Sequence, residues 1–525
     1  NKIKNRLLEI ENTDFYNLFD ELKKEEIKNK FYYVIKTSEI LSKKYEVVTT
    51  NPPYMGSSMM DSKLSKYTKK NYPDSKSDMF AVFIERCDNL TKKNCYTSMI
   101  TMQSWMFLSS FEVLRKNIIE KTEIKSLNHL GTRAFSEIGG EVVSTVAWVS
   151  KKKTPKNDGT YVRLVDYNNA ELKEEEFFNK TNYYQAKQKD FEKILGSPIV
   201  YWVSDKVREI FEKNQKLGEV GKSIQGMSSA DNNRFLRLWN EVNYSKIGYN
   251  MENSQEALES KKKWFPYNKG GEFRKWYGNQ EYLVNWENDG YEIKNFKKAV
   301  LRNPNYYFKE SISWSLITST TSSFRYYPNG FIFDAAGSSY FSKENIFVTL
   351  GYLNSIFGSF VSNILNPTVN LSNGIVEKFP NLYIQNQKNI CYLVQQNISI
   401  SKEEWDSRET SWDFEKLSLI DGEDLKSAFE NYCSHWRDNF VQLHKNEEEL
   451  NRLFIEIYEL QDEMDEKIEF KDITILQEET SIIRIDNSIS KEFLTESEKY
   501  LYDRGVSLEF NKNVLIKQFI SYAVG

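Results

Sequence analysis

Residue types that commonly hold metals or form disulfides are scarce in this sequence. Its 525 residues include three histidines and four cysteines, and no two cysteines form a CxxC pair; they are Cys87, Cys95, Cys391 and Cys433. Zinc sites and disulfide frameworks both require such clusters. The sequence also lacks a run of about 18 apolar residues, the length that a membrane-spanning helix needs. We therefore expect no metal site, no membrane partner and a reduced, cytoplasmic protein.

The chain lacks a strong excess of either charge. It has 71 Lys and Arg against 75 Asp and Glu, a net charge of −4, with 40% hydrophobic and 28% charged residues. This composition is typical of a soluble globular protein, and the length suits two to four domains. A nearly neutral total does not exclude a nucleic-acid partner, because such binding depends on a local basic face.

Strand and helix patterns alternate over the first 150 residues. Buried, β-branched runs predict strands, and apolar residues at helical spacing predict helices. The strands are expected over 45–50, 95–101, 124–130 and 141–152, and the helices over 77–93 and 109–121. This alternation is typical of a parallel α/β sheet with crossover helices. The last strand follows a short loop, so we expect it to be antiparallel, at or near an edge.

The composition and pattern of the sequence change after this α/β region. A polar stretch to about residue 195 suggests a helical connector. Aromatic residues with Gly, Asn and Pro punctuation then predict a separate α+β domain, and an acidic helical region follows, with helical spacing at Leu450, Leu453, Phe454, Ile457, Leu460 and Met464. The predicted boundaries are 1–155, 156–204, 205–385 and 386–525.

The sequence Asn51-Pro52-Pro53-Tyr54 directly follows the first predicted strand. Ligands of open α/β sheets bind beyond the carboxyl ends of the strands, where this turn is expected. The Asn51 amide oxygen and the Pro52 carbonyl offer two acceptors in a stiff turn, and Pro52 has no N–H to compete for them. Tyr54 adds a flat aromatic face. The turn thus predicts a receptor for the –NH₂ group of a planar ring, activated to attack an electrophilic methyl group.

NPPY after "VVTT" resembles the catalytic motif of amino-group methyltransferases that use S-adenosylmethionine. "SDMFAVFIERCDNLTKKNCYTSMIT" resembles the helix and strand that follow this motif in γ-class N6-adenine methyltransferases. A more specific resemblance, which covers most of the chain, is to BREX-type (bacteriophage exclusion) adenine-specific DNA methyltransferases of the PglX type, related to type IIG enzymes. It rests on "NPPYMGSSMM", "YPDSKSDMFAVFIERC", "SWMFLSSFEVLR", "RAFSEIGGEVV", "DNNRFLRLW", "YNKGGEFRKWYGN", "VNWENDGYEIK" and "WDSRETSWDF".

This resemblance implies a partial Rossmann-like methyltransferase sheet, then an α+β target-recognition domain over 205–385 and a helical C-terminal region. It implies N6-methylation of a flipped adenine in double-stranded DNA, S-adenosylmethionine as cofactor, and other BREX proteins as partners in anti-phage defence. Asn51, Pro52, Pro53 and Tyr54 would be catalytic, Tyr54 and Phe135 would stack on the base, and Phe83 is a candidate cofactor contact.

Basic residues between glycines and aromatics in the 205–385 region suit contacts with DNA phosphates or guanine. The candidates are Asn232, Asn233, Arg234, Lys269, Arg274, Lys275 and Arg325. A solvated charged surface is the alternative explanation for each of them. The lysine-rich stretch 57–76 after NPPY is expected to be a polar loop, either an ordinary one or one that closes over the flipped nucleotide.

The glycine-rich cofactor loop that this family carries well before NPPY does not occur in residues 1–50. We therefore expect a central fragment of a longer protein, inactive alone and weak in cofactor binding. Two other functions stay open. One is a non-catalytic DNA-recognition or defence scaffold, and the other is a protein glutamine methyltransferase, which would leave the aromatic, basic domain unexplained.

Overall fold

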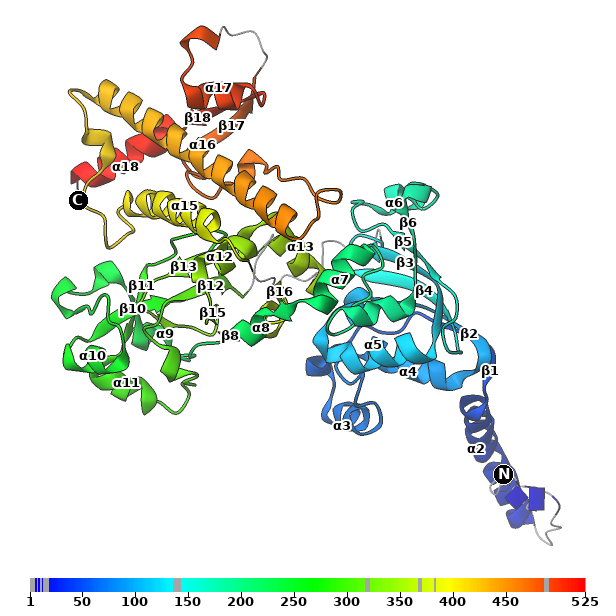
Figure 1. Cartoon of the computed structure of the whole chain (residues 1–525). Coiled ribbons are helices and arrows are strands. Elements are labelled where there is room, and N and C mark those ends of the chain that lie inside the picture. Colours follow the sequence, from blue (N-terminus) through cyan, green and yellow to red (C-terminus); the bar gives the residue numbers. More distant parts are fainter. Residues whose placement is uncertain are drawn as a thin grey trace. The chain divides into compact units, whose positions relative to one another are not determined.

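The computed structural model describes residues 18–135, 143–316, 322–366, 371–381, 384–485 and 491–524, with a few positions before residue 18. The chain forms two compact units, Asn1–Glu212 (unit 1) and Lys213–Gly525 (unit 2). Figure 1 shows the elements of each unit along the chain. Unit 1 is built on one mixed sheet, and unit 2 contains several smaller sheets and the longest helix of the described residues.

The sheet of unit 1 has six strands in the order β1-β2-β4-β3-β5-β6. Their bounds are Tyr45–Thr50, Thr91–Met102, Glu123–Gly131, Thr145–Lys151, Gly159–Arg163 and Tyr183–Ala186 for β1 to β6. β1 is parallel to β2, β3 is parallel to β5, and β4 is antiparallel to both of its neighbours. The expected antiparallel direction of β4 is confirmed, but its expected edge position is wrong. Its alternate residues are buried because β4 lies between β2 and β3.

The two predicted crossover helices are present, as α4 (Met79–Leu90) between β1 and β2 and α5 (Glu112–Lys121) between β2 and β3. They lie beside each other along the sheet (Figure 1). Of the residues that predicted these helices, Phe80, Ile84, Cys87, Leu114 and Ile118 are buried, whereas Phe83 and Leu90 are half-buried. A long helix, α2 (Leu18–Ser42), precedes β1.

The stretch 57–76, expected to be a loop, contains helix α3 (Ser62–Asn71). The Asp61 carboxylate begins this helix by accepting hydrogen bonds from the backbone N–H groups of Lys63 and Leu64 at 2.8 and 2.9 Å. Such a cap satisfies donors that the first helical turn leaves free. Thr68 is buried and its hydroxyl contacts Met60. A cap and a single buried position therefore hold a helix whose other residues are mostly polar.

The expectation of a helical connector over 156–204 is also corrected, because β5 and β6 extend the sheet of unit 1 there. The helical part is limited to α6 (Ala170–Glu176) and short 3₁₀ turns, before α7 (Asp205–Lys213). Tyr161 and Val162 of β5 are buried, and the Tyr161 ring stacks on Tyr201 at 4.7 Å. The prediction followed the polar composition of the stretch and so missed this short buried strand.

Unit 2 begins with short strands around an aromatic core, as the texture of 205–385 predicted. One sheet has the order β14-β10-β11-β9 and the other β13-β12-β15-β8. The bounds are Gly221–Ile224 for β8, Leu236–Leu238 for β9, Trp264–Asn268 for β10, Tyr282–Asn285 for β11, Ser311–Ser315 for β12, Phe324–Tyr327 for β13, Ile332–Phe333 for β14 and Gly337–Ser342 for β15. Phe265, Trp286 and Phe308 lie in one buried cluster.

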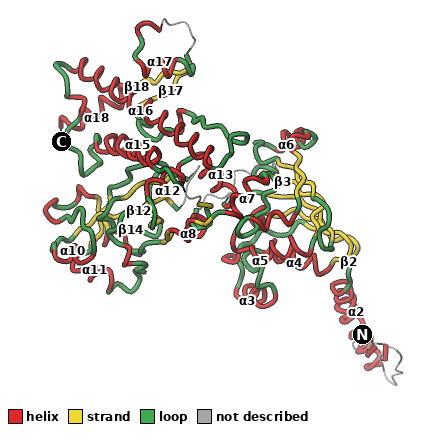
Figure 2. Tube along the Cα trace, in the orientation of Figure 1, coloured by secondary structure: helices red, strands yellow, loops and turns green. Residues whose placement is uncertain are grey.

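Helices dominate the second part of unit 2 (Figure 2). The main ones are α12 (Ile346–Asn354), α13 (Ile356–Leu365), α15 (Lys388–Asp406), α16 (Leu425–Ile457), α17 (Glu496–Tyr502) and α18 (Lys512–Val524), with a hairpin of β17 (Thr480–Arg484) and β18 (Val506–Phe510). Leu450 and Phe454 are buried in α16 as predicted. The helix ends at Ile457, before Leu460 and Met464, because Glu459 takes a left-handed φ of 56°.

The shorter elements of unit 2 are β7 (Gln215–Lys216), α8 (Leu217–Val220), α9 (Asn232–Phe235), α10 (Ser254–Glu259), α11 (Glu287–Lys294), α14 (Asn373–Val376) and β16 (Pro380–Asn381). Across the described ranges, no single helix is long and apolar enough to span a membrane. The apolar helices α12 and α13 reach such a length only together, with a bend of 72° between them, and both bury most of their residues inside unit 2.

Candidate active site and nucleic-acid interface

The NPPY turn lies at the carboxyl end of β1. β1 is parallel to β2, and β3 is parallel to β5. Because β4 lies between β2 and β3 and is antiparallel to both, β2 and β3 also run in the same direction. The carboxyl ends of β1, β2, β3 and β5 therefore lie at the same sheet edge. This is the edge where α/β sheets bind ligands. Asn51 is exposed, Pro52 is buried and Tyr54 is half-buried. The amide of Asn51 is therefore accessible from solvent, while Pro52 fixes the turn to the unit.

Tyr54 lies against both its own turn and helix α4. Its hydroxyl donates a hydrogen bond to Asn51 Oδ1 at 3.3 Å, and its ring meets Phe80 edge-on with 6.3 Å between centroids. Phe80 packs in turn against Phe111 at 5.5 Å. Partial burial raises the pKa of Tyr54, so the hydroxyl stays protonated and able to donate at neutral pH. An aromatic chain from the interior thus supports the ring next to the amide acceptor.

Asp78, which the sequence analysis did not single out, ties the turn to α4. Its Oδ1 accepts from the backbone N–H of Met55 at 3.0 Å and from that of Phe80 at 3.2 Å. The backbone N–H of Met79 also donates to the Met55 carbonyl at 3.0 Å. Burial raises the pKa of the Asp78 carboxyl. An Asp directly before an apolar helical run, as in "SDMF", is the sequence signal for such a cap.

The side chains of His129 and Gln103 join two strand ends at the same sheet edge. His129 lies in β3, and Gln103 follows β2. Gln103 Oε1 accepts from His129 Nε2 at 2.7 Å, and the Tyr201 hydroxyl lies 3.1 Å from Nδ1. Burial lowers the pKa of His129 to about 3. The imidazole is neutral and fully bonded, so it supports the edge and does not act as an acid or base there.

The two other aromatic candidates occupy different positions. Phe135 is half-buried in the turn after β3, and therefore lies at the same sheet edge as Asn51 with β2 and β4 between their strands. Residues 136–142, which complete that loop, lie outside the described residues. Phe83 is half-buried in α4. Neither position assigns a ligand contact, so both roles remain predictions.

Helix α3 carries most of the lysines that follow the NPPY turn. Lys63, Lys66, Lys69 and Lys70 are exposed on it, and Lys76 is exposed shortly after it. In the part of the chain that the structure describes, no ion pair involves any of the five. The cationic charge next to Asn51 is therefore presented by an ordered helix and not by a loop.

The predicted DNA contacts of unit 2 fall into an exposed and a buried group. Asn232, Asn233 and Arg234 are exposed on α9, and Lys269 is half-buried with its ammonium 5.0 Å from the Tyr282 ring centroid. Arg234 Nη2 pairs with Glu292 at 2.7 Å, at the surface, where such a pair is weak. These four residues are placed where a nucleic acid has access to them.

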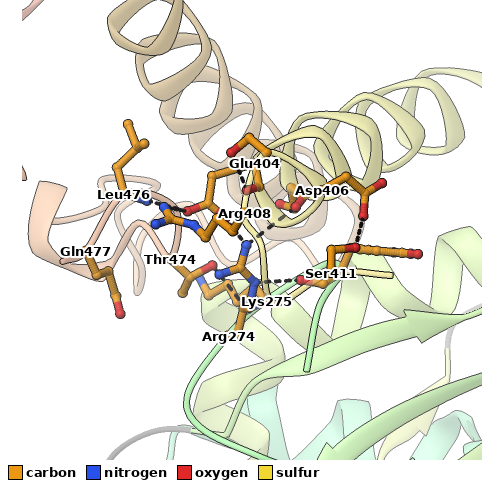
Figure 3. A network of polar contacts seen from close by, with 12 residues as sticks. Arg274, Lys275, Glu404, Asp406, Arg408, Ser411, Thr474, Leu476 and Gln477 are labelled. Carbon is orange, nitrogen blue, oxygen red and sulfur yellow. Dashed lines mark hydrogen bonds and ion pairs between the residues drawn. The ribbon is translucent and has the colours of Figure 1, made fainter. Parts of the chain in front are cut away.

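Arg274, Lys275 and Arg325 belong to the buried group, and their predicted contact with DNA is corrected. Arg274 pairs with Glu404, which also binds Arg408 and the backbone N–H of Leu476 (Figure 3). Lys275 Nζ lies 2.6 Å from Glu447 Oε2. The side chains of Arg274 and Lys275 are only 13% and 12% exposed.

Arg325 is fully buried in β13. Its Nη1 donates to the Arg274 carbonyl at 3.1 Å and its Nη2 to Ser315 Oγ at 3.2 Å. Burial lowers its pKa. A guanidinium with protein acceptors inside the core has no face for phosphate or guanine. The error arose because an arginine among aromatics has the same sequence signature whether it reads DNA or links strands in a core.

Glu404 is the centre of this buried network. Burial by itself raises its pKa, but the two guanidinium groups of Arg274 and Arg408 outweigh that effect and hold the pKa at about 2. Arg408 also reaches Glu479 at 2.7 Å, and Glu479 accepts from the Tyr432 hydroxyl at 2.6 Å. The network joins the 270–282 loop to α15 and α16. No group of three or more metal-ligating side chains occurs among the described residues.

The chain is similar in sequence to a family of restriction-modification methylases and to adenine-specific methyltransferases. The model of the Eco57I restriction-modification methylase family matches residues 1–135. The adenine-specific methyltransferase PglX of Lacticaseibacillus casei (strain Zhang) is 42% identical over 466 residues, covering 84% of this chain and 38% of that protein. The adenine-specific methyltransferase BrxX of Escherichia coli O9:H4 (strain HS) is 36% identical over 509 residues, covering 94% of this chain and 39% of that protein.

The chain thus spans somewhat under two fifths of the length of these two relatives. Among solved structures, the type IIL restriction-modification enzyme MmeI in complex with DNA has a TM-score of 0.50 at 12% identity, covering 80% of this chain and 55% of that chain. This likeness concerns the fold, and it agrees with the predicted partial Rossmann-like sheet followed by an α+β domain and helices. By its sequence similarity over most of its length, the chain belongs to the family of PglX and BrxX adenine-specific methyltransferases.

Proposed function

We propose that this chain carries the adenine-amino receptor of a site-specific DNA N6-adenine methyltransferase that acts in the cytoplasm as part of BREX anti-phage defence. The observation that supports this most is the Asn51–Tyr54 turn at the ligand-binding edge of an α/β sheet, with an exposed amide acceptor beside an aromatic ring. The similarity to adenine-specific methyltransferases agrees with that chemistry.

The residues of the turn would act on the amino group of the base. Asn51 Oδ1 and the Pro52 carbonyl would accept its two hydrogens, which increases the electron density on N6 and makes it a better nucleophile. Pro52 has no N–H to occupy a nearby acceptor. The Asp78 carboxylate would keep the turn in place through the Met55 N–H. No basic side chain is needed for this activation.

The target adenine has to leave the duplex to reach this turn, at a cost of roughly a few kcal/mol. The Tyr54 ring, and Phe135 at the end of β3 on the same sheet edge, would offset that cost by stacking, with about 1–3 kcal/mol for each base–aromatic contact. Phe80 contacts the Tyr54 ring, and Phe111 contacts Phe80 in turn. Stacking of the flipped base is therefore a second task of the same turn.

S-adenosylmethionine is the methyl donor that the family implies. The residues present do not by themselves fit it, because positions 1–50 contain no glycine and hence no glycine-rich loop to hold the cofactor. Within the described residues, β1 pairs with β2 alone. Phe83 remains the candidate that α4 offers to the cofactor. The chain thus supplies the receptor for the amino group, and we expect weak or no cofactor binding by the chain alone.

We further propose that double-stranded DNA meets both units. In unit 1 the exposed lysines of α3 would contact phosphates next to the NPPY turn, and in unit 2 Asn232, Asn233, Arg234 and Lys269 would contact the recognition site. Other BREX proteins are proposed partners. The sequence context that is methylated would be set by unit 2, because base-edge contacts carry the sequence information.

A second candidate function is a non-catalytic DNA-recognition or defence scaffold. The exposed Asn232, Asn233 and Arg234 suit this candidate without any catalytic step, whereas the NPPY turn favours the methyltransferase. Methyl transfer from labelled cofactor to DNA separates the two. In the intact enzyme, Asn51→Ala should abolish N6-methyladenine in sequenced genomic DNA, while Asn71→Ala at an exposed position of α3 should not. Persistent methylation in Asn51→Ala would reject the methyltransferase assignment.

A further inference from the structure

A basic segment of unit 2 lies outside all the residues that the sequence analysis singled out. It runs from Phe296 to Lys309, between α11 and β12, and contains no Asp or Glu. Its cationic residues are Lys297, Lys298, Arg302 and Lys309. The three lysines are exposed and Arg302 is half-buried. The segment therefore presents positive charge to solvent without an acidic residue of its own.

The acidic residues around this segment are bound elsewhere. Glu292 pairs with Arg234, Asp289 with Lys294, and Glu310 accepts from the Tyr326 hydroxyl at 3.1 Å. Within the described ranges, none of the four cations of the segment forms an ion pair. A polyanion could therefore bind these cations without breaking an existing ion pair.

The segment is held rigidly against the unit. Ser228 and Val300 exchange two backbone hydrogen bonds of 2.9 Å, and Asn303 Nδ2 donates to the Gln225 carbonyl at 2.9 Å. Tyr307 and Phe308 are buried, at 2% and 0% exposure. The cations thus stand on a fixed backbone, and little conformational entropy of the chain is lost when they bind.

Strand β8 places a further cation, Lys222, next to Tyr306 of this segment. The ring of Tyr306 packs on Phe341 at 4.7 Å. The ammonium of Lys309 lies 5.4 Å from its centroid, and that of the exposed Lys222, in β8, lies 5.8 Å from it. Two cations from distant parts of the sequence are therefore gathered around one aromatic ring.

The segment also adjoins the proposed recognition residues of α9. The Ser228–Val300 pair places it beside the loop that leads into Asn232–Arg234. The guanidinium of Arg234 lies 5.3 Å from the centroid of Phe296. The basic segment and the α9 residues consequently belong to one continuous stretch of surface.

We propose that Lys222 and the segment 296–309 form the surface of unit 2 that holds the phosphate backbone of duplex DNA. Exposed, unpaired cations on a rigid backbone suit phosphates, which fix position and carry no sequence information. The inference rests on the proposed action on DNA and adds the place where unit 2 holds the duplex. α9, beside this surface, would then be positioned for base contacts.

The test compares the full chain with the variant Lys297→Ala/Lys298→Ala/Lys309→Ala. Binding of a labelled duplex of about 30 base pairs is measured by fluorescence anisotropy between about 50 and 200 mM salt. We expect the slope of log affinity against log salt to fall by about 0.9 for each phosphate that the variant no longer neutralises, roughly 2–3 in total. The weakening of binding should be the same for duplexes of different sequence, because phosphates are common to all of them.

Two variants control for folding and for net charge. Lys297→Arg/Lys298→Arg/Lys309→Arg keeps the charges and should bind as the parent does. Lys388→Ala/Lys471→Ala/Lys517→Ala removes the same charge from exposed lysines of the helical region and should keep the parent slope. Equal slopes for the parent and the first variant, an equal fall in slope for this control, or no duplex binding by the parent would overturn the proposal.

The proposal would also be overturned if the variant Lys297→Ala/Lys298→Ala/Lys309→Ala bound duplex DNA as the parent does but no longer bound single-stranded RNA or an acidic protein. That result would assign the surface to the partner that was lost. Methyl transfer is not the readout. DNA binding by the chain through this surface, together with no Asn51-dependent methylation by the intact enzyme, would support the surface and reject the methyltransferase. The two proposals therefore fail separately.

Discussion

The Tyr54 hydroxyl lies 3.3 Å from Asn51 Oδ1 and donates a hydrogen bond to it. The acceptor proposed to bind the adenine amino group is therefore occupied by the side chain proposed to stack on the same base. In the proposed complex, an adenine amino group would compete with that hydroxyl for Asn51 Oδ1, and the base would gain the ring as a stacking surface.

We expect Tyr54→Phe to keep methylation and to bind the flipped base at least as well as the parent, because the ring stays and the competing hydroxyl is gone. Tyr54→Ala should weaken binding of the flipped state by about 5- to 150-fold, the equivalent of 1–3 kcal/mol of stacking. Fluorescence of 2-aminopurine at the target position measures this state. If Tyr54→Phe is as inactive as Tyr54→Ala, the hydroxyl has a chemical role and the stacking explanation is wrong.

Removing the Asp78 carboxylate should loosen the turn. In Asp78→Ala the N–H groups of Met55 and Phe80 lose their acceptor, which should lower the stability of unit 1 by about 0.5–2 kcal/mol, as for other helix caps. Methylation by the intact enzyme should fall further than this loss of folded protein explains, with a lower kcat. Asp78→Asn retains the acceptor oxygen and should restore most of both. Equal kcat values in Asp78→Ala and the parent would contradict a positioning role.

Unit 2 should lose stability in acid as Glu404 takes up a proton. Its pKa is about 2 in the folded chain, against 4.5 for a glutamate surrounded by water, so the stabilisation is present above pH 4.5 and is lost as the pH falls towards 2. Chemical denaturation at a series of pH values measures this. Glu404→Gln should lower stability at neutral pH by about 3–5 kcal/mol, because Arg274 and Arg408 lose a buried partner. Glu423→Gln, at an exposed site, is the control and should change little.

His129 should remain neutral at pH 5. Its pKa is lowered to about 3 by burial, whereas the unfolded chain takes up a proton near pH 6.5. Between these values the unfolded state binds more protons, so unit 1 loses stability as the pH falls. The imidazole signals in NMR spectra report the charge directly, and His129→Gln identifies the resonance. A charged His129 at pH 5 would show that burial does not keep the imidazole neutral.

Replacing Arg325 should affect folding and leave DNA binding alone. Arg325→Met removes the donor from buried carbonyl and hydroxyl acceptors, at a cost of about 1–3 kcal/mol for an unsatisfied group. The salt slope of duplex binding by the folded variant should equal that of the parent. Arg484→Met, at an exposed position, should change neither quantity. A smaller salt slope of duplex binding in Arg325→Met would show that Arg325 contributes to DNA contact.

The sequence predicted the parts of unit 1 in which one local signal dominates. The β-branched run of β1 and the spacing of Phe80, Ile84 and Cys87 in α4 each determine an element by themselves, and so do the two prolines that end β1. The receptor turn was predictable for that reason. Its support by Asp78 was visible in principle, since Asp precedes the apolar run of α4.

The parts that were not predicted depend on distant partners. β4 lies between β2 and β3, which no property of residues 145–151 specifies, and β5 is short and followed by polar sequence. Arg274 and Arg325 have the same neighbours in the sequence whether they face solvent or, as here, bind Glu404 and buried carbonyl and hydroxyl groups respectively. The segment 296–309 was missed as well, because the exposure of its cations follows from the burial of Tyr307 and Phe308, which lie between Arg302 and Lys309.

The position of β4 has a consequence for the order of folding. β2 and β3 do not pair with each other, so neither can join the sheet through the other until β4 bridges them. Contacts between strands that are distant in the chain form slowly, because the loop between them has to close first. During synthesis, β1 and β2 emerge with the NPPY turn well before β4 does. Exposed strands at this stage are prone to aggregation. The sheet edge on which Asn51 lies therefore cannot be continuous from β1 to β3 until residues 145–151 have been synthesised.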